Sequence, residues 1–582
     1  MAQWMIYTKR ADFPALSVKH NITPVTARIM TNRGILPEDF ESYLSCDMKN
    51  LNSPWLFKDM EKAVDILAGK IAEGKNIRVI GDYDIDGVCA TYIITDGIRR
   101  LGGRADMDIP DRVKDGYGIN INIIDRAIKA GTDTIVTCDN GIAAVDEIQY
   151  AIDKGLTVIV TDHHQVPVDD KGVCVRVKAD ATINQHQPNC NYPYKSLCGA
   201  AVAMKLMEAL HEKLNVAYDT DKYIEPAAIA TIGDVVDLNG ENRIIAKAGL
   251  ERLRNPGNLG IKALMEVCGI DASRLSSYHI GFIIGPCLNA GGRLETAKKA
   301  FSLLAAGSYK EALEKAEELK RLNDERKSMT DEAVEKAGAL AELCEDKNVL
   351  VLYVKGVHES IAGIVAGRIR ERFYKPVIVL TDSDVEGEAK GSGRSIEGYD
   401  MFRELSRCQQ LFTRFGGHEM AAGLSIPKEN IKAFEAMVNE NESMTEDILT
   451  EKIWIDVKMP FSYISESFIE ELSLLEPFGK ANEKPLFAEK PVELLSFTIM
   501  GKNRNVLKMT LRGEDKSYIQ AMYFGDIEEL KENITEKYGS KQLDRARMGR
   551  DNDIRMAVTY YPQINTYNGK TSVQIVVRQI QI

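Results

Sequence analysis

Four short acidic clusters stand out in this chain, and each begins where an apolar run ends. They lie at residues 82–87 (DYDIDG), 139–141 (DNG), 162–164 (DHH) and 233–234 (GD). Carboxylate and imidazole groups that are brought together form a binding site for hard divalent cations. A pair of such cations activates water and stabilises the leaving oxygen in phosphoryl chemistry. The clusters therefore predict metal-dependent hydrolysis of phosphoesters.

The runs before the first three clusters have the composition of buried parallel strands. Residues 77–80 (IRVI), 134–136 (TIV) and 156–160 (LTVIV) are short, rich in β-branched residues and almost continuously apolar. Helical stretches are expected at 87–100, 121–129 and 143–154. Because open α/β sheets bind ligands at the carboxyl ends of their strands, the clusters are expected to converge on one crevice. Several carboxylates held there would repel one another without counter-charge, which is a second argument for metal ions.

The ligand types indicate which ions the site holds. Oxygen ligands favour Mg²⁺ or Mn²⁺, and the imidazole of His163 shifts the preference towards Mn²⁺. A bridging carboxylate would set two ions about 3.5–4 Å apart. Zinc is disfavoured because no cysteine belongs to the set. His164 cannot easily bind the same ion as its neighbour, so we expect it to donate to a phosphate oxygen or to protonate the leaving group.

A purely structural role is the alternative for each cluster. An aspartate after a strand often caps the next helix, and Asp-Gly is a common turn. For one cluster alone, this explanation is as good as a metal site. The combination favours the metal site, because the clusters follow one another after apolar runs and two of only eight histidines are adjacent beside Asp162.

The clusters resemble the motifs of the DHH family of phosphoesterases, and more narrowly those of its RecJ branch of single-stranded-DNA-specific exonucleases. The four motifs are residues 81–87 (GDYDIDG), 137–141 (TCDNG), 161–164 (TDHH) and 233–237 (GDVVD). Further similar runs extend along nearly the whole chain, at 31–35, 109–112, 116–118, 197–201, 285–293, 362–368, 390–395, 416–423 and 476–479.

The resemblance implies a role for individual residues. The metal ligands would be Asp84, Asp86, Asp139, His163 and Asp234. Asp82 would ligate or orient the ions, and we expect Asp82 and His164 to be the catalytic residues. The phosphates of the strand would contact Arg112, Asn289, Arg293, Arg368, Ser392, Arg394 and His418.

Two positions depart from the family pattern. Many DHH enzymes have a histidine four residues before the position of Asp84, and this chain has Ile80. Many RecJ sequences have an arginine after the proline at 286, and this chain has Cys287. One metal ion is therefore expected to be held less tightly, and Arg293 is the safer phosphate contact.

The length predicts several domains, because 582 residues are too many for one core. We expect an α/β fold: a parallel-sheet DHH phosphoesterase domain, a long linking helix, an α/β DHH-associated domain and a C-terminal β-barrel. The helix follows from Ala, Glu, Leu and Lys at helical spacing over 309–346, and the barrel from alternating strands after about residue 441. The predicted limits are 1–50 for a helical cap on the metal domain, 51–306, 307–346, 347–443 and 444–582.

The resemblance identifies the barrel as an OB-fold, which binds single strands by stacking bases on aromatic rings. Its candidate rings, which are alternatively core residues, are Tyr523, Phe524, Tyr560, Tyr561 and Tyr567. A basic stretch lies at 541–550.

The net charge of −12 does not exclude nucleic acid, because part of the acidity belongs to the metal site and local positive charge decides binding. The glycine-rich loop before Arg394 suits an anion. The run Arg368, Arg370, Arg372 and Lys375 either contacts the strand or forms a solvated helix face.

The sequence predicts a cytoplasmic protein that does not span a membrane. It has ten cysteines without a C-x-x-C pair, no long apolar run and no secretory pattern.

The predicted function is a DNA repair and recombination exonuclease that uses two Mn²⁺ or Mg²⁺ ions to release mononucleotides from single-stranded DNA. The 5′ to 3′ direction is implied by the resemblance alone. We expect a monomer that works with a helicase and a single-strand-binding protein. One alternative is a DHH phosphodiesterase of short oligoribonucleotides or cyclic dinucleotides, which the length and the barrel disfavour. Another is a non-catalytic relative that clamps DNA, which the complete set of metal ligands disfavours.

Overall fold

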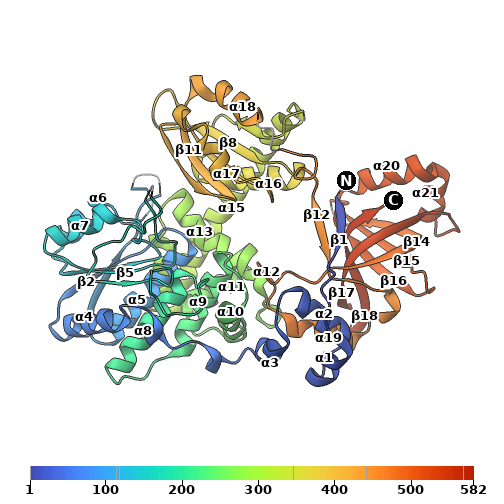
Figure 1. The fold of residues 1–582 in the computed structure, drawn as a ribbon. Coiled ribbons are helices and arrows are strands. Elements are labelled where there is room, and N and C mark those ends of the chain that lie inside the picture. The colour runs from blue at the N-terminus through green and yellow to red at the C-terminus, as the bar shows by residue number, and fades with distance from the viewer. Residues whose placement is uncertain are drawn as a thin grey trace. The chain divides into compact units, whose positions relative to one another are not determined.

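A computed structural model describes the chain apart from residues 1, 113, 114, 117, 170, 345, 441–443, 502 and 568, and apart from the side chain of Tyr567. The chain forms two compact units (Figure 1). The first contains residues 48–451, and the second combines residues 2–47 with residues 452–582. Within the described residues, no helix has the length and apolar character needed to cross a membrane.

The first unit begins with a five-stranded sheet in the order β3-β2-β4-β5-β6, and all of its strands are parallel. The strands are β2 (Asn76–Ile80), β3 (Arg104–Asp108), β4 (Thr134–Cys138), β5 (Thr157–Thr161) and β6 (Ala181–Ile183). The three predicted strands are therefore confirmed, together with the parallel sheet.

Helices cover both faces of this sheet, which explains why its strands are so apolar. Val79, Val136 and Ile159 belong to one core cluster, with α4 (Met60–Ala72), α5 (Ile85–Arg100) and α8 (Gly199–Lys213). Alternate strand residues such as Ile80 and Ile135 belong to a second cluster, with α6 (Ile121–Lys129) and α7 (Val145–Asp153). The sheet is thus fixed between two layers, and the carboxyl ends of its strands stay available for the site.

Further helices follow the first sheet in the same unit. They are α9 (Thr220–Gly233), α10 (Gly240–Arg252), α11 (Leu259–Val267), α12 (Ser277–His279), the π-helical turn η5 (Ile280–Ile284), α13 (Gly285–Leu294) and α14 (Lys298–Leu304). The predicted linking helix is α15 (Tyr309–Glu342), whose 34 residues begin after Ser308, the N-cap that accepts from the amide of Glu311. Ala316, Leu319 and Leu322, three of the alanines and leucines at helical spacing from which the helix was predicted, are buried.

A second sheet in the same unit follows α15, with the order β10-β11-β9-β8-β7. Its strands are β7 (Leu350–Tyr353), β8 (Val377–Asp382), β9 (Glu388–Arg394), β10 (Arg414–His418) and β11 (Ala421–Pro427). The helices of this part are α16 (Glu359–Phe373), α17 (Met401–Ser406) and α18 (Ile431–Asn439). The α/β architecture of this part agrees with the domain that was expected after the linking helix.

The second unit contains the predicted barrel. Its strands are β13 (Val457–Lys458), β14 (Phe487–Met500), β15 (Val506–Arg512), β16 (Tyr518–Tyr523), β17 (Arg555–Tyr567) and β18 (Lys570–Gln581). The order β13-β14-β15-β16-β18-β17 is closed by pairing of β14 with β17, so the sheet has the form of an OB-fold. The helices are α19 (Glu466–Leu472), α20 (Ile527–Tyr538) and α21 (Ser540–Arg547), and α21 contains most of the basic stretch at 541–550.

The barrel aromatics fall into two groups. Tyr560 is fully buried and its hydroxyl donates to the Met459 carbonyl at 2.6 Å, and Tyr561 is also buried. These two residues are therefore core, as the alternative explanation held. Tyr523 is half-buried and Phe524 is exposed, so both present ring surface. The side chain of Tyr567 lies outside the described residues.

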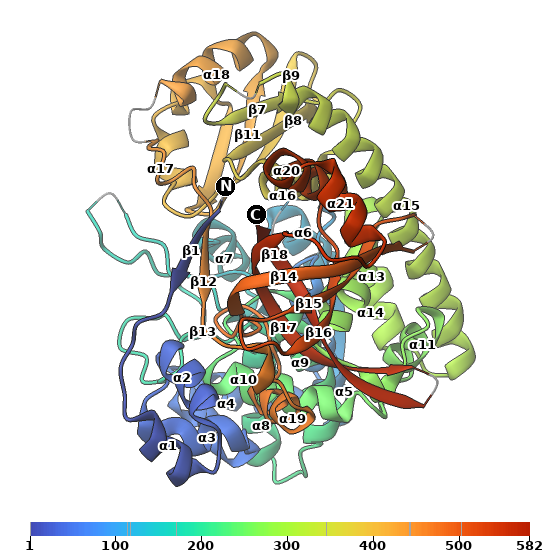
Figure 2. The ribbon, with the colours of Figure 1, turned by 90° about the vertical axis from the view of Figure 1, so that its right-hand side faces the viewer.

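The N-terminal segment packs on the barrel instead of capping the metal-binding domain, which corrects the sequence prediction. It consists of β1 (Gln3–Ile6), α1 (Phe13–His20), α2 (Pro24–Asn32) and α3 (Phe40–Ser45). Strand β1 pairs in parallel with β12 (Lys452–Ile455), and Figure 2 shows the two side by side. Leu16, Ile29 and Phe40 join the core of the barrel. The apolar faces of these helices were evident in the sequence, but the surface that covers them was not.

Glu471 of α19 binds the N-terminal segment to the rest of the second unit. Its carboxylate accepts from the backbone amide of Thr23 at 2.7 Å and from the Thr23 hydroxyl at 2.8 Å. We expect Glu471→Ala to lower the free energy of unfolding of the second unit by about 2 kcal/mol, because two part-buried donors lose a charged acceptor.

The measurement is urea unfolding followed by tryptophan fluorescence in a Trp55→Phe background. The chain has three tryptophans, so Trp4 and Trp454 then report on the second unit alone. The exposed neighbour Glu470, replaced by alanine, is the matched control. Equal unfolding midpoints for the two variants would contradict the role of Glu471.

Candidate metal centre

The acidic clusters lie together at the carboxyl end of the first sheet. Asp82 and Asp84 follow β2, Asp139 follows β4 directly, and His163 and His164 come after β5. Asp234 is the C-cap residue of α9. The structure brings together all seven residues that the sequence singled out for metal binding and catalysis, in groups whose ligand atoms lie within 4.8 Å: Asp139, His163 and His164; Asp86, His163 and Asp234; Asp82, Asp84 and Asp139.

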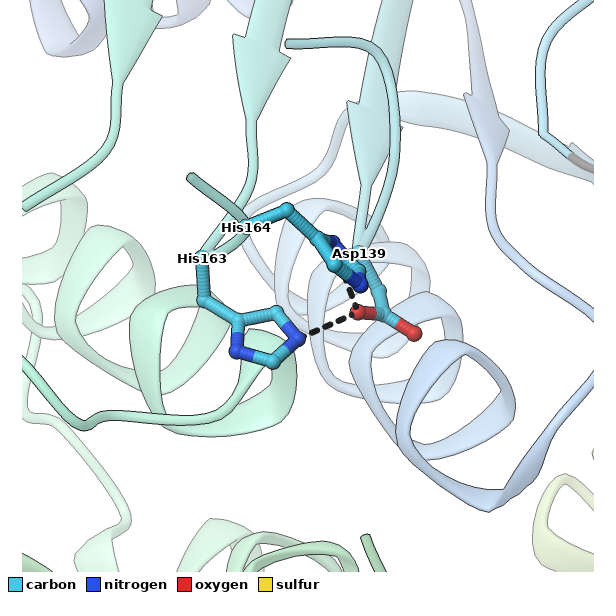
Figure 3. A group of neighbouring side chains, drawn as sticks. All are labelled: Asp139, His163 and His164. Carbon is cyan, nitrogen blue, oxygen red and sulfur yellow. Dashed lines mark ion pairs between the residues drawn. The ribbon is translucent and has the colours of Figure 1, made fainter. Parts of the chain in front are cut away.

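Asp139 lies at the meeting point of two of these groups. Its Oδ1 atom is 3.0 Å from His163 Nε2 and 4.0 Å from His164 Nδ1, and Figure 3 shows both rings directed towards the carboxylate. The backbone of Asp139 has a φ of 61°, in the left-handed region that non-glycine residues rarely adopt. A strained backbone at a cluster of ligands is a common mark of a functional site.

Two helix N-termini hold the carboxylates in place. Asp84 caps α5, with Oδ1 accepting from the amides of Asp86 at 2.9 Å and Gly87 at 3.1 Å. The helix-capping explanation is therefore true of this residue, and it leaves the second carboxylate oxygen for a ligand. Asp86 is fully buried and accepts from the first amides of α8, Gly199 at 2.6 Å and Ala200 at 2.7 Å. Partial positive charge at both helix ends offsets part of the mutual repulsion.

The remaining repulsion shows in the pKa values. Burial, together with the charge of Asp84, raises the pKa of Asp82 and of Asp86 above the ordinary range. Burial and the charges of Asp86 and Asp84 raise the pKa of Asp139. Asp82 Oδ1 is buried and has no hydrogen-bond partner among the described residues. Buried carboxylates with raised pKa values and an unused oxygen fit a pair of divalent cations, which would supply the missing positive charge.

The two histidines have different properties. Burial lowers the pKa of His163, so its imidazole is neutral and suited to ligate a metal ion. His164 Nδ1 lies 2.7 Å from Asp162 Oδ1. Although burial opposes protonation, this hydrogen bond raises the pKa of His164 to about 9. The ring is half exposed, so a protonated His164 can reach a bound phosphate.

Asp162 is a functional residue to which the sequence reasoning gave no role. It is almost completely buried and accepts from the backbone amides of His163 at 2.7 Å and Ile142 at 2.9 Å, in addition to its contact with the His164 ring. It therefore fixes the orientation of His164. Its position directly before the histidine pair was the available signal.

A basic cluster of Arg112, Arg293, Arg326 and Arg394 adjoins the acidic residues. Burial, together with repulsion from the other three guanidinium groups, lowers the pKa of Arg293 to about 10. Within the part of the chain that the structure describes, none of the four forms an ion pair with a carboxylate. Tyr83 joins the two clusters, since Arg112 lies over its ring at 4.9 Å and α13 packs against its backbone at Gly292. Unneutralised positive charge next to a metal site suits a phosphodiester.

Individual hydrogen bonds place these arginines. Arg293 Nη1 donates to the Ser360 carbonyl at 2.8 Å, and Arg394 Nη1 donates to Ser392 Oγ at 3.1 Å. His418 is exposed at the end of β10. The register pairs both His418 and Arg394 with Ala421 of β11, so the three predicted residues of this sheet lie at one edge.

Arg326 was missed by sequence reasoning. It is nearly buried in α15, and its Nε and Nη2 donate to Asn323 Oδ1 at 3.2 and 3.0 Å. With Asn289 and Arg293 it lines a pocket of about 110 Å³ that also includes Gly233, the neighbour of Asp234. Asn323 and Arg326 interrupt an otherwise apolar stripe of the helix, and that interruption was the signal in the sequence.

Arg368 borders the basic cluster, since burial and the charge of Arg368 lower the pKa of Arg326, but unlike the four arginines it is paired with a carboxylate. Its Nη1 lies 2.5 Å from Asp331 of α15, and Arg372 is paired in the same way with Glu342 at 2.6 Å. Both are exposed. Arg368 and Arg372 therefore fit the alternative of a solvated helix face, in which they are paired with the acidic side chains of a neighbouring helix, whereas Arg370 is paired with Glu371 of its own helix at 3.1 Å.

The two departures from the family pattern lie in packed surroundings. Ile80 is fully buried in the core between the sheet and α6. Cys287 is fully buried, with its sulfur 3.8 Å from that of Cys268 and 3.3 Å from Asn323 Nδ2. At position 80 a packed apolar side chain thus takes the place of the family's histidine, and at position 287 a packed thiol takes the place of its arginine. Tyr117, in another of the family-like runs, lies outside the described residues.

Comparison with known proteins agrees with this geometry. Residues 76–231 match the DHH family, N-terminal domain, residues 346–443 match the DHHA1 domain, and residues 455–579 match the RecJ OB domain. The single-stranded-DNA-specific exonuclease RecJ of Bacillus subtilis is 36% identical over 88% of this chain and 64% of the relative. That of Escherichia coli is 32% identical over 98% of this chain and 97% of the relative.

Solved structures are also similar. RecJ from Thermus thermophilus in complex with Mn²⁺ has a TM-score of 0.81 at 25% identity and covers all of this chain and 79% of that one. A structure of exonuclease RecJ bound to manganese has a TM-score of 0.59 at 31% identity, over 68% of this chain and 96% of that one. The fold and the acidic site are those of a metal-dependent DHH phosphoesterase. The chain belongs to the RecJ family of these enzymes.

Gly199 provides a test of the centre. A Cβ atom at this position would lie 2.7 Å from the Cβ of Asp139 and would disturb the α8 amides that hold Asp86. We expect Gly199→Ala to weaken Mn²⁺ binding by about 10- to 100-fold, the range seen when groups that support metal ligands are changed.

The measurement is calorimetric titration of the full chain with Mn²⁺. Gly69→Ala in α4 is the control, because a Cβ at Gly69 meets nothing within 4 Å. Unchanged affinity in Gly199→Ala would show that the ions bind elsewhere.

Proposed function

We propose that this chain is a single-stranded-DNA-specific exonuclease that hydrolyses one phosphodiester at a time and releases mononucleotides in DNA repair and recombination. The observation that carries the proposal is the contact of two clusters of opposite charge. Buried carboxylates and imidazoles suited to two divalent ions adjoin four guanidinium groups that have no carboxylate partner in the described chain. A phosphodiester is the anion that both clusters accommodate.

The metal ligands in this proposal are Asp84, Asp86, Asp139, His163 and Asp234, which would hold two Mn²⁺ or Mg²⁺ ions. Such ions lower the pKa of a water molecule and offset negative charge on the phosphodiester. Asp82, whose Oδ1 is free of hydrogen bonds to described residues, would ligate or orient the pair.

The chain's other residues bind the phosphate and move a proton. His164, held protonated by Asp162, donates a proton to the leaving oxygen or to a phosphate oxygen. Arg112, Arg293, Arg326 and Arg394 neutralise the negative charge that develops on the phosphate oxygens. Asn289, Ser392 and His418 bind flanking phosphates.

The choice of substrate rests on the relatives and on the barrel. The curated relatives are described as specific for single-stranded DNA, and the RecJ OB domain belongs to a fold that binds single strands. We further propose 5′ to 3′ polarity, action as a monomer, cooperation with a helicase and a single-strand-binding protein, and a cytoplasmic location. The domain limits 51–306, 307–346, 347–443 and 444–582 belong to the same proposal.

The two alternatives explain less of the chain. A phosphodiesterase of dinucleotides has no use for a separate barrel unit of this size. A non-catalytic DNA clamp has no use for a complete set of buried, mutually repelling carboxylates, because their assembly costs free energy that the helix N-termini offset only in part.

The central experiment is a nuclease assay with the full chain, Mn²⁺ and 5′-labelled single-stranded DNA. We expect release of mononucleotides from single-stranded DNA, and slow or no cleavage of duplex DNA, of RNA of the same length and of a dinucleotide. Asp139→Ala and His163→Ala should abolish cleavage because they remove ligands, while strand binding measured by fluorescence anisotropy stays within a few-fold of the wild type. Preferred cleavage of the dinucleotide would favour the first alternative, and loss of strand binding in these variants would contradict the assigned roles.

A second test compares an arginine of the basic cluster with an ion-paired arginine on the surface of α16. We expect Arg394→Gln to raise KM for single-stranded DNA by about tenfold or more, because it removes a charge-assisted contact to a phosphate. Arg368→Gln should change KM by less than about twofold, since an exposed ion pair contributes little. Steady-state kinetics on one oligonucleotide measure both, and a larger effect of Arg368→Gln would reverse the assignment.

A further inference from the structure

Two large aromatic rings are exposed at the start of the segment that leads into α13. Tyr278 is 60% exposed and Phe282 is 67% exposed, although both are side chains that folding normally buries. Their rings are stacked, with centroids 5.0 Å apart and planes inclined by 25°. They thus form an exposed apolar stack on the first unit.

The backbone beneath these rings is held firmly and has an unusual conformation. Phe282 lies in the π-helical turn η5, and π-helical turns occur frequently at functional sites. Ile280 and Ile284 of the same turn are fully buried in the main core. The rings are therefore presented to solvent by an anchored element, so their exposure is not the result of a loose loop.

The same segment lines the pocket of about 110 Å³ described above, which we call the phosphate pocket. Gly281 and Gly285 lie in its wall, together with Asn289, Arg293 and Arg326. Asn289 Oδ1 is buried and has no hydrogen-bond partner among the described residues. The pocket also contains Gly233, so it adjoins the metal ligand Asp234. The exposed rings therefore belong to the same short segment whose glycines line a positively charged pocket beside the metal centre.

We propose that Tyr278 and Phe282 form a stacking platform for the bases of the DNA strand whose phosphate occupies this pocket. The proposal rests on the proposed function. The occupant follows from charge and shape together: the pocket suits an anionic backbone, and the adjoining rings suit the flat faces of bases. Every base has such a face, so the platform binds strands of any sequence.

The platform also contributes to the choice of single strands. In a duplex, each base is already stacked and paired, and exposing its face to the rings requires unstacking. In a single strand, the faces are available. The rings thus favour an unpaired strand next to the site of hydrolysis, in addition to whatever the OB domain binds.

The test combines removal of a ring with removal of a base. Strand binding is measured by fluorescence anisotropy in an Asp139→Ala background, which prevents cleavage during the measurement. We expect Phe282→Ala and Phe282→Leu to weaken binding of a single-stranded oligonucleotide by about tenfold, and Phe282→Trp to retain it, because a flat ring and not only an apolar group is required. Tyr278→Ala should have a similar effect.

Abasic sites introduced one at a time along the oligonucleotide identify the stacked base. At one or two positions, the abasic site should weaken strand binding by the Asp139→Ala protein that retains Phe282. The same abasic site should not weaken strand binding any further when Phe282→Ala is also present. The matched control is Phe402→Ala, which removes an exposed ring from another stacked pair of the first unit, Phe402 and the half-buried Phe415 at 5.2 Å and 15°. It should leave strand binding unchanged.

The outcomes for the platform and for the function are distinct. If the wild type cleaves single-stranded DNA but Phe282→Ala and Tyr278→Ala bind it as tightly as their parent, the platform is overturned and these rings are left for a protein partner. If binding depends on Phe282 and on one base but the wild type cleaves nothing, the platform stands and the proposed function falls.

Discussion

The repulsion among buried carboxylates at one edge of a parallel sheet is the constraint on which this structure depends. Asp82, Asp86 and Asp139 are all nearly or fully buried, and burial raises the pKa of each. The protein opposes this tendency with the amides at the N-termini of α5 and α8 and with the ring of His163. These groups supply only partial charge, so the arrangement is complete only with cations.

The layered fold follows from the same requirement. A sheet covered on both faces keeps its strands rigid and brings residues from distant parts of the sequence to a common edge. Helix α8 packs against α5 and the sheet, and its first turn meets Asp86 and Asp139. The helix that fills the core thus also fixes the ligands, which explains why a glycine stands at 199.

The distribution of positive charge prepares the site for an anionic substrate. The chain is acidic as a whole, with a net charge of −12, yet Arg112, Arg293, Arg326 and Arg394 are gathered where a phosphodiester would meet the metal ions. Arg368 and Arg372 of α16 show the contrast, because acidic residues of α15 neutralise them. Local pairing, and not the total number of basic residues, decides which of them are available to an anion.

The sequence by itself determined the strands, the long helix, the barrel and the set of metal-binding candidates. These features depend on local periodicity and on motifs that directly follow strands, so Asp139 or His163 could be selected without coordinates. Asp84 shows that the two explanations of such a motif are compatible, since it both caps a helix and belongs to a ligand group.

Only the tertiary structure decided which surfaces meet. It paired β1 with β12 and placed Phe40 in the barrel core, tied Arg368 to Asp331, buried Tyr560, and brought Arg326 to the pocket beside Arg293. The physical reason is that a sequence shows which face of an element is apolar or charged, whereas the partner of that face lies hundreds of residues away or on another helix. That choice is made by packing of the whole chain.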